Sequence, residues 1–284
     1  MSAKDDADAA YRAELLDDLT VAAGRLGVRV AGDPVFGWRD RTVGAPVATG
    51  EGRRWLRLVR EMVEWTDNEF WTGNADAAVL PAAVRRPSVV RVEEWDDGPR
   101  RFRAELMTLV DAVRCSPTPE LRTVPSVDAR WWASLRASLE ALARTPTSRT
   151  AMTGEGVSRN LLVFFGIDVD PSLIEWSAAH GDLQWTNLTT PECWLLDWET
   201  WGQAPAGLDA ATLYCHSLLV PDVESTVHET FADLLDTPAG QIAQLVAASR
   251  VLRGVDGGDY PDLAVPLHRH ARRIIAGIDI GVLR

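Results

Sequence analysis

The sequence predicts an α+β protein with two lobes, a strand-rich N-terminal lobe over residues 1–112 and a mainly helical lobe over residues 113–284. Up to about residue 112, short alternating segments are separated by turn-forming residues, which is typical of strands and hairpins. Beyond residue 127, apolar residues recur at helical spacing instead. A ligand site between two such lobes is a common arrangement.

The N-terminal lobe is expected to begin with a helix over residues 9–26. Residues 66–80 are expected to form a second helix, capped by Thr66 or Asp67. The sequence Asp96-Asp97-Gly98-Pro99 predicts the turn of a hairpin. The strands expected in this lobe occupy residues 28–38, 42–49, 55–59, 89–94 and 102–110.

The C-terminal lobe is expected to begin with a helix over residues 128–144, with Ser126 as its N-cap. This segment places Trp131, Leu135, Leu139 and Leu142 on one helix face. An intervening segment, residues 177–201, has neither a helical pattern nor the composition of a simple loop. Further helical patterns occupy residues 207–220, 222–236, 237–253 and 262–276.

Composition excludes several classes of protein. Hydrophobic residues at 46% and charged residues at 25% are typical of a globular protein. A net charge of −12 argues against nucleic-acid binding, which needs a basic face. It is typical of soluble proteins in general and also fits a cationic small substrate. No apolar run is long enough to cross a membrane, and the N-terminus lacks a signal-peptide core, so we expect a cytoplasmic protein with no membrane partner.

Lysine is almost absent from the chain. Of the 29 lysines and arginines only Lys4 is a lysine, and it lies in the acidic N-terminal segment. The folded lobes therefore have no lysine for a GK[ST] phosphate loop, a Schiff base or a lysine nucleophile. Any cation that binds phosphate there must be an arginine.

Oxygen-bearing side chains are concentrated in the intervening segment. Asp182 and Asn187 are five residues apart and bracket a loop, and Pro191-Glu192 then turns the chain into a short apolar strand, Trp194–Leu196. A hairpin of this length would return Asp197 to the loop. Carboxylate and amide oxygens are suited to Mg²⁺, and the remaining carboxylate could accept a proton from an attacking hydroxyl.

These residues carry a family resemblance. The motif His180-Gly181-Asp182-x-x-x-x-Asn187, followed by Leu196-Asp197-Trp198-Glu199, resembles the aminoglycoside phosphotransferase-like kinase family, which includes choline and homoserine kinases. The segment from Gly202 to Ala211 resembles a further motif of that family, in which an aspartate braces the catalytic loop. The resemblance is strong over residues 177–217, and the two-lobed layout agrees with it over most of the chain. It implies a bilobal protein-kinase-like fold.

The resemblance also implies a reaction, the transfer of the γ-phosphoryl group of ATP or GTP to a hydroxyl of a small molecule, with Mg²⁺ as cofactor. The acceptor would be an aminoglycoside-like antibiotic or a metabolite. Asp182 would be the catalytic base, and Asn187 and Asp197 would hold Mg²⁺. His180 and Asp209 would support the loop without reacting.

Lesser roles follow for a few other side chains. Gln184 would make a minor contact to the phosphates. Glu199 would lie next to the metal ligands, or would be a solvent-facing acid. The acidic loop with Asp256, Asp259 and Asp262 would bind ammonium groups of the acceptor, as loops at this position do in relatives.

In the N-terminal lobe, the family places a strand lysine, sometimes an arginine, at the α- and β-phosphates. Arg54, Arg57 and Arg60 are the candidates here. Side chains alternate along a strand, so Arg57 points away from Leu56 and Leu58 and toward the ligand if those two leucines enter the core. The alternative is that Arg57 is a solvent-facing strand residue.

Further parts of the N-terminal lobe follow from the resemblance alone. The hinge that offers backbone groups to adenine would comprise Met107, Leu109 and Val110. The helix acid that pairs with the phosphate-binding cation would be Glu69 or Asp76. The loop over residues 37–44 would cover the phosphates, or would be a simple hairpin turn.

The acceptor is expected to be small, because only ten residues separate Asp197 from the helix near Gly207. A segment this short has no room for the peptide-binding loop of protein kinases. Two alternatives remain. The missing lysine motivates a catalytically reduced nucleotide-binding or regulatory module of the same fold, and the same fold could also transfer a nucleotidyl group.

Overall fold

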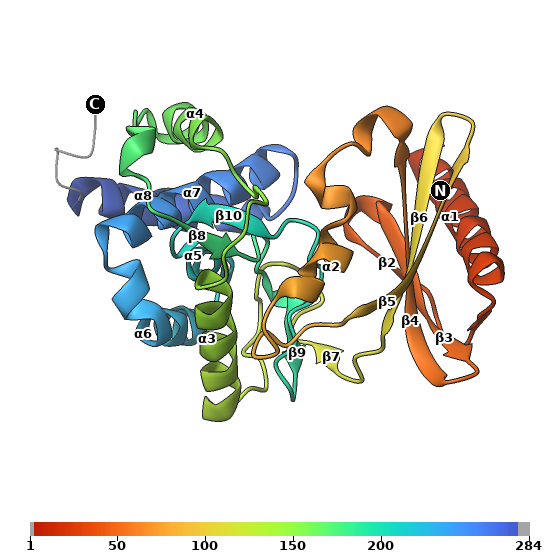
Figure 1. The fold of residues 1–284 in the computed structure, drawn as a ribbon. Helices are drawn as coiled ribbons and strands as arrows, with labels where there is room; N and C mark the ends of the chain where they lie inside the picture. Colours follow the sequence, from red (N-terminus) through yellow and green to blue (C-terminus); the bar gives the residue numbers. More distant parts are fainter. Residues whose placement is uncertain (1–2, 278–284) are drawn as a thin grey trace. The chain divides into compact units, whose positions relative to one another are not determined.

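A computed structural model describes residues 3–277, which form two compact units (Figure 1). The first unit contains residues 3–78 together with residues 87–111. The second contains residues 79–86 together with residues 112–277. The sequence predicted a single boundary after residue 112. The chain instead enters the second unit at residues 79–86, returns to the first unit for residues 87–111 and then continues in the second.

Hydrogen bonds explain why residues 79–86 belong to the second unit. The Ser138 hydroxyl donates to the Ala83 carbonyl at 3.0 Å, and the Leu195 N–H donates to the Arg85 carbonyl at 2.9 Å. The Arg86 guanidinium closes the segment by donating to the Leu80 carbonyl at 3.0 Å. These contacts pair backbone carbonyls that would otherwise lack partners.

The first unit is an antiparallel sheet with one long helix, α1 (Ala3–Leu26), on one face. The strand order is β1-β3-β4-β6-β5, and β2 pairs with β3. The first two strands have two residues each, where the sequence predicted one strand over residues 28–38. The strands are β1 (Arg29–Val30), β2 (Val35–Phe36), β3 (Thr42–Thr49), β4 (Gly52–Met62), β5 (Val89–Asp97) and β6 (Arg100–Thr108).

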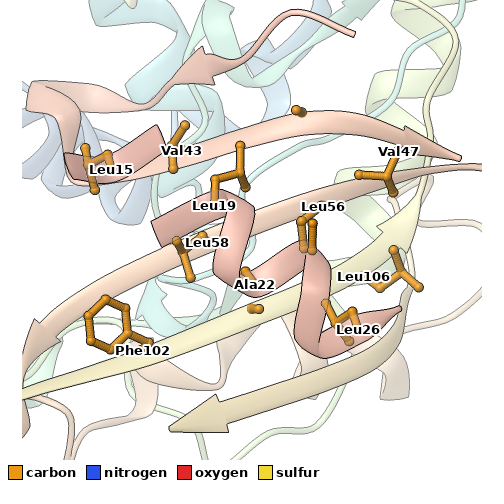
Figure 2. Packing of buried hydrophobic residues seen from close by; sticks show 13 residues of the cluster. Leu15, Leu19, Ala22, Leu26, Val43, Val47, Leu56, Leu58, Phe102 and Leu106 are labelled. Atoms are coloured by element: carbon orange, nitrogen blue, oxygen red, sulfur yellow. The ribbon is translucent and has the colours of Figure 1, made fainter. Parts of the chain in front are cut away.

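The core of this unit lies between α1 and the sheet (Figure 2). Even-numbered residues of β4 and β6 point to this side, among them Leu56, Leu58 and Leu106, and they meet Leu15 and Leu19 of α1. Each fully buried leucine contributes about 1.5–3 kcal/mol. The odd-numbered residues of both strands consequently point to the opposite face of the sheet.

The prediction of a helix over residues 66–80 is wrong. The chain forms a series of short turns there, because the Asn68 side chain accepts the Phe70 N–H at 2.9 Å and Gly73 lowers helix propensity. The elements are 3-10 turns at Val63–Trp65, Glu69–Trp71 and Ala77–Val79 and a single helical turn, α2 (Gly73–Asp76).

The second unit is mainly helical (Figure 1). Its centre is α5, which is buried over its whole length and packs against α6 and α7. The helices are α3 (Ala129–Ala143), α4 (Gly154–Phe165), α5 (Leu208–Ser217), α6 (Pro221–Leu235), α7 (Pro238–Asp256) and α8 (Ala264–Gly277). Short strands pair as β8 (Trp176–Ala179) with β10 (Gly202–Pro205) and as β7 (Val113–Arg114) with β9 (Thr189–Thr190).

The start of α3 differs from the expected one. Asp128, not Ser126, is its N-cap, since the Asp128 carboxylate accepts the Trp131 N–H at 2.9 Å. The Ser126 carbonyl instead accepts the Thr190 hydroxyl at 2.7 Å, which ties the preceding loop to β9. Within residues 3–277 every helix is too short or too polar to cross a membrane.

Candidate active site

A short hairpin in the second unit brings the three predicted oxygen-bearing residues into one region. Leu188 and Leu195 form an antiparallel bridge, and the Leu196 N–H donates to the Asn187 carbonyl at 2.8 Å. Asp197 is the next residue, and it has a positive φ of 63°. The hairpin expected from Pro191-Glu192 therefore forms and returns Asp197 to the loop that carries Asn187.

His180 links the loop that carries Asp182 to the returning arm of this hairpin from inside the protein. It is fully buried, and its Nδ1 accepts the Asp182 N–H at 3.3 Å. The ring proton must therefore be on Nε2, which donates to the Leu196 carbonyl at 2.8 Å. A neutral His180 thus holds the backbone of Asp182 and the residue before Asp197 at the same time.

Asp209 supports the loop from α5. Its two carboxylate oxygens accept the N–H groups of His180 at 2.7 Å and Gly181 at 3.0 Å. Burial raises the pKa of Asp209, while the two backbone donors act in the opposite direction. The carboxylate lies in the first turn of α5, where a negative charge is favourable.

Gly181 is required by the backbone of this turn. Its φ is +83°, and a Cβ added there would lie 2.5 Å from the Thr200 carbonyl oxygen. The Thr200 hydroxyl in turn donates to the His180 carbonyl at 3.1 Å. A side chain at position 181 would therefore strain the backbone and would push Thr200 away from His180 and Gly181.

Two amide groups orient the Asp182 carboxylate. Gln184 Nε2 and Asn187 Nδ2 both lie near Asp182 Oδ2, at 3.0 and 3.3 Å, and Asn187 Nδ2 also donates to the Asp182 carbonyl at 2.8 Å. Both donors use Oδ2, so Oδ1 is the oxygen that can turn toward a substrate hydroxyl. Asn187 uses its nitrogen in these contacts, so its amide oxygen is the atom that can face a cation.

The residues after Asp197 are part of the protein interior. Trp198 packs edge-on against His180 with 4.6 Å between ring centres, and its indole N–H donates to the Leu195 carbonyl at 2.8 Å. Glu199 is buried, so the solvent-facing alternative for it is wrong. Its backbone carbonyl accepts a guanidinium N–H of Arg149 at 3.3 Å.

In the first unit, Arg57 lies on the sheet face opposite α1, as the alternation along β4 predicts. The register of β4 and β6 places Arg57 opposite Glu105, and Arg57 Nη1 lies 3.3 Å from Glu105 Oε2. The Arg57 side chain is only 12% exposed, so the solvent-facing alternative is wrong. Glu105 is buried and also accepts from Asn74 at 3.0 Å and Arg103 at 2.9 Å.

Glu105 is a residue that the sequence reasoning missed. The expected partner of the cation was a helix acid, Glu69 or Asp76, but this carboxylate comes from the neighbouring strand. Glu105 was detectable in principle, because pairing β4 with β6 in register places it across from Arg57. Asp76 accepts the Thr72 hydroxyl at 2.6 Å.

The other two arginine candidates have different surroundings. Arg60 points to the opposite face of the sheet, where it pairs with Asp18 at 2.5 Å and Glu14 at 3.1 Å of α1. Arg54 lies 3.8 Å from Glu51 beside the β3–β4 turn. Of the three arginines, Arg57 alone lies on the polar face with Glu105.

The expected hinge residues lie at the end of β6. Met107 is buried within the strand, which ends at Thr108, and Leu109 and Val110 follow outside it. The Thr108 N–H donates to the Ser88 carbonyl at 2.9 Å, and the first unit ends at residue 111.

The loop over residues 37–44 contains a 3-10 turn, Trp38–Asp40, in which Arg39 and Asp40 have positive φ angles of 51° and 55°. Arg12 of α1 holds this turn through an ion pair with Asp40 at 2.7 Å. The loop is therefore fastened to the helix on the core side of the sheet.

The acidic loop of the second unit is partly neutralised. Asp262 pairs with Arg122 at 2.8 Å, and Arg122 also pairs with the buried Glu120 at 2.8 Å. Tyr260 has a φ of 50° and places its ring edge-on to His216, with 5.6 Å between ring centres. Arg122 and Tyr260 give this loop a cation and an aromatic ring beside its acids.

The chain is similar to known proteins in structure, not in sequence. No family model and no curated protein matches the chain. Among solved structures, the chain is similar to aminoglycoside phosphotransferase APH(4)-Ia, with a TM-score of 0.61 and 12% identity over 94% of this chain and 100% of that one. The chain has the fold of the aminoglycoside phosphotransferase-like kinases.

Two further structures with this fold contain nucleotide. A thermostable mutant of APH(4)-Ia in a ternary complex with ADP and hygromycin B gives a TM-score of 0.60 at 11% identity, over 92% of this chain and 98% of that one. Amicoumacin kinase hAmiN with AMP-PNP, Ca²⁺ and Ami gives 0.55 at 11% identity, over 92% and 94%. The predicted kinase-like α+β fold is therefore confirmed, and activity has to be argued from the residues.

Proposed function

We propose that this protein is a kinase that transfers the γ-phosphoryl group of ATP or GTP to a hydroxyl group of a small molecule. The arrangement of Asp182 supports this proposal most directly. Its carboxylate is oriented through Oδ2 by two amide groups, and its backbone is held by the buried ring of His180. Such an arrangement suits a general base whose second carboxylate oxygen must point at the hydroxyl group that it deprotonates.

Asp182 acts on the acceptor hydroxyl. As the hydroxyl oxygen attacks the γ-phosphorus, its proton passes to Asp182 Oδ1, and the bond to the nucleoside diphosphate breaks. Gln184 and Asn187 keep Oδ2 occupied, so the carboxylate cannot rotate away from the acceptor. Gln184 is therefore proposed to position Asp182, and not to contact the phosphates as the sequence suggested.

Asn187 and Asp197 are the residues that would hold Mg²⁺. The contacts of the Asn187 side-chain nitrogen direct its amide oxygen away from Asp182. Asp197 is exposed and directly follows Leu196, whose N–H donates to the Asn187 carbonyl. When bound, Mg²⁺ would neutralise charge on the β- and γ-phosphates. Within residues 3–277 no group of three or more His, Cys, Asp or Glu side chains is gathered around a metal position, so the nucleotide would have to complete the coordination.

The first unit would bind the nucleotide. Arg57 is the cation proposed to contact the α- and β-phosphates, since a guanidinium keeps the charge of the usual lysine and can bind phosphate through two N–H groups. Glu105 would hold it in place from β6. Backbone groups at Met107, Leu109 and Val110 would contact the adenine or guanine ring.

The acceptor is proposed to be a hydroxylated small molecule, either an aminoglycoside-like antibiotic or a metabolite. APH(4)-Ia with hygromycin B and hAmiN with Ami are the structurally similar proteins that motivate this class. Asp256 and Asp259 favour an acceptor with ammonium groups, whereas Asp262 of the same loop already pairs with Arg122. The short connection from Asp197 to α5 favours a small acceptor over a peptide.

The test is a screen of ATP and GTP against hydroxylated antibiotics and metabolites, with the product mass measured. A gain of one phosphate supports the kinase, whereas a gain of one nucleotide would show nucleotidyl transfer. Asp182→Ala should lower turnover by a factor of about 10² to 10⁴, the range for loss of a general base. Asp168→Ala removes an exposed acid of the same unit and should leave turnover unchanged.

The binding-module alternative has its own outcome. Nucleotide binding that requires Mg²⁺, without any product and without hydrolysis that depends on Asp182, would replace the kinase by a module that only binds. Loss of nucleotide binding in Asp197→Ala would still assign the metal site in that case.

A further inference from the structure

Arg250 has no part in the function described so far, yet it contacts the catalytic loop directly. It lies on α7, and its Nη1 donates to the Gly181 carbonyl oxygen at 2.5 Å. The helix that carries it packs against α5, which supplies Asp209. The two residues in contact are 69 positions apart in the sequence.

Both polar groups of Gly181 are thereby bonded to charged side chains. Its N–H donates to Asp209 of α5, and its carbonyl accepts from Arg250 of α7. Gly181 lies directly before Asp182 and has the positive φ that turns the chain toward it. Fixing both ends of this residue fixes the direction in which Asp182 leaves the turn.

The charges around Arg250 favour this arrangement. Asp182 and Asp209 act on it as opposite charges, while Arg253, one turn further along α7, acts as a like charge. Burial lowers the pKa of the guanidinium, and burial lowers the pKa of the nearby His216 to about 4, so that histidine is neutral. A half-buried cation is costly unless it is paired, and here the carboxylates of Asp182 and Asp209 offset that cost.

A guanidinium suits this position for a physical reason. It stays protonated despite burial, and its rigid fork directs one N–H at a carbonyl while its charge remains close to the carboxylates. Hydrogen bonds from a charged donor contribute more than neutral ones. A neutral side chain of the same length would keep the space filled but would leave Asp182 and Asp209 without this half-buried counter-charge.

We propose that Arg250 is a positioning residue for phosphoryl transfer, which holds the Gly181 carbonyl and so sets the place of the Asp182 carboxylate. The proposal rests on the proposed kinase function for its effect on turnover, but not for its effect on the loop. Arg250 is not expected to touch the nucleotide or the acceptor.

The first measurement is hydrogen exchange of the amides of residues 180–182, which needs no substrate. In Arg250→Ala these amides should exchange about tenfold faster or more, because loss of a charge-assisted hydrogen bond frees the turn. Arg253→Ala is the matched control, since Arg253 is on the same helix and donates to Asn160 of α4 instead. It should leave the exchange of residues 180–182 unchanged.

The second measurement is turnover with the acceptor found in the screen. Arg250→Ala should lower kcat by about tenfold to a hundredfold while the KM for the nucleotide stays within about twofold, because the loop and not the binding contacts is disturbed. Added guanidinium ion should restore part of the kcat of Arg250→Ala, and Arg250→Lys should retain more activity than the alanine variant. If Arg250 only stabilised the fold, its loss would not lower kcat selectively over KM, and guanidinium ion would not restore kcat.

The outcomes separate the two proposals. Unchanged exchange of residues 180–182, or faster exchange with an unchanged kcat, would overturn the role of Arg250. If the wild-type protein transfers no phosphate, the kinase proposal fails, and the exchange experiment still decides whether Arg250 holds the loop. If Arg250→Ala does not fold, Arg250→Lys decides by the same exchange and kcat measurements against Arg253→Lys.

Discussion

The two sets of charged residues proposed for the reaction, Arg57 with Glu105 and the turn that carries Asp182, are held in place in different ways. On the sheet of the first unit, Arg57 and Glu105 face each other across β4 and β6 in a regular register. In the second unit, Asp182 lies in an irregular turn with a positive φ at Gly181. The sheet positions a side chain by alternation and register, whereas the turn needs bonds from separate helices.

This difference has a consequence for what a mutation does. A change at Arg57 removes one charge from a sheet whose backbone hydrogen bonds remain intact. A change at Asp209 or Gly181 removes support from the backbone on which Asp182 is carried. Variants of the sheet should therefore affect nucleotide affinity, and variants of the turn should affect turnover.

Among the variants that compare the sheet with the turn, the largest effect is expected for Asp209→Ala. Two buried N–H groups, those of His180 and Gly181, would lose their acceptor, which costs roughly 2–4 kcal/mol in total. Displacement of Asp182 should lower kcat by about a hundredfold, with the KM for the nucleotide little changed. Chemical unfolding and steady-state kinetics measure the two quantities.

Asp222→Ala is the matched control for this variant. Asp222 also lies in the first turn of a helix, α6, but it is exposed. It tests the helix-dipole contribution alone, which is about 0.3–1 kcal/mol. An equal loss of stability and turnover in both variants would contradict the bracing role of Asp209.

Gly181→Ala should come next in size. The new Cβ would lie 2.5 Å from the Thr200 carbonyl oxygen at a φ of +83°, so strain and overlap should together cost about 2–3 kcal/mol. Gly98→Ala separates the two causes, because Gly98 has a φ of +59° but nothing within 4 Å of the new Cβ. It should lose only the conformational part, about 1 kcal/mol. Equal losses in thermal unfolding would remove the close approach at Gly181 from the explanation.

Arg57→Ala tests the sheet side of the comparison. The KM for the nucleotide should rise by about tenfold, since one charge-assisted phosphate contact is lost, and Arg57→Lys should recover part of it. Arg54→Ala, on the same strand but the other face, serves as the control. A nearly silent Arg57→Ala would show that the arginine-rich composition has no functional meaning at this position.

The smallest effect expected is a difference in acid sensitivity between the units. All five histidines belong to the second unit, and burial lowers the pKa of His216 and His270 from 6.5 to about 4. The unfolded chain therefore binds these protons more readily, so stability falls as the pH falls from 6.5 toward 4. Each histidine should lower the free energy of unfolding by about 1 kcal/mol between pH 6.5 and 5.5.

Urea unfolding at several pH values measures this dependence. His216→Gln and His270→Gln should each flatten the decrease in stability, and His268→Gln, at an exposed position of α8, should not. The raised pKa of Asp209 acts in the opposite direction, so each variant is compared with the wild-type slope. Identical slopes in all three variants would contradict buried neutral histidines.

The sequence determined the parts of the site that depend on neighbours in the chain. The spacing of Asp182 and Asn187 and the turn at Pro191-Glu192 predicted the hairpin that returns Asp197. Alternation along β4 predicted that Arg57 would point away from the core. These features follow from local periodicity and short-range hydrogen bonds, which a single sequence carries.

The tertiary structure decided the rest. The bonds of Gly181 to Asp209 and Arg250 join residues 28 and 69 positions apart, and the pairing of Arg57 with Glu105 spans 48. Local side-chain bonding at Asn68 replaced the helix expected over residues 66–80. Which charged side chain reaches a buried backbone group depends on how the helices and strands pack, and that packing is settled by the burial of apolar surface over a whole unit.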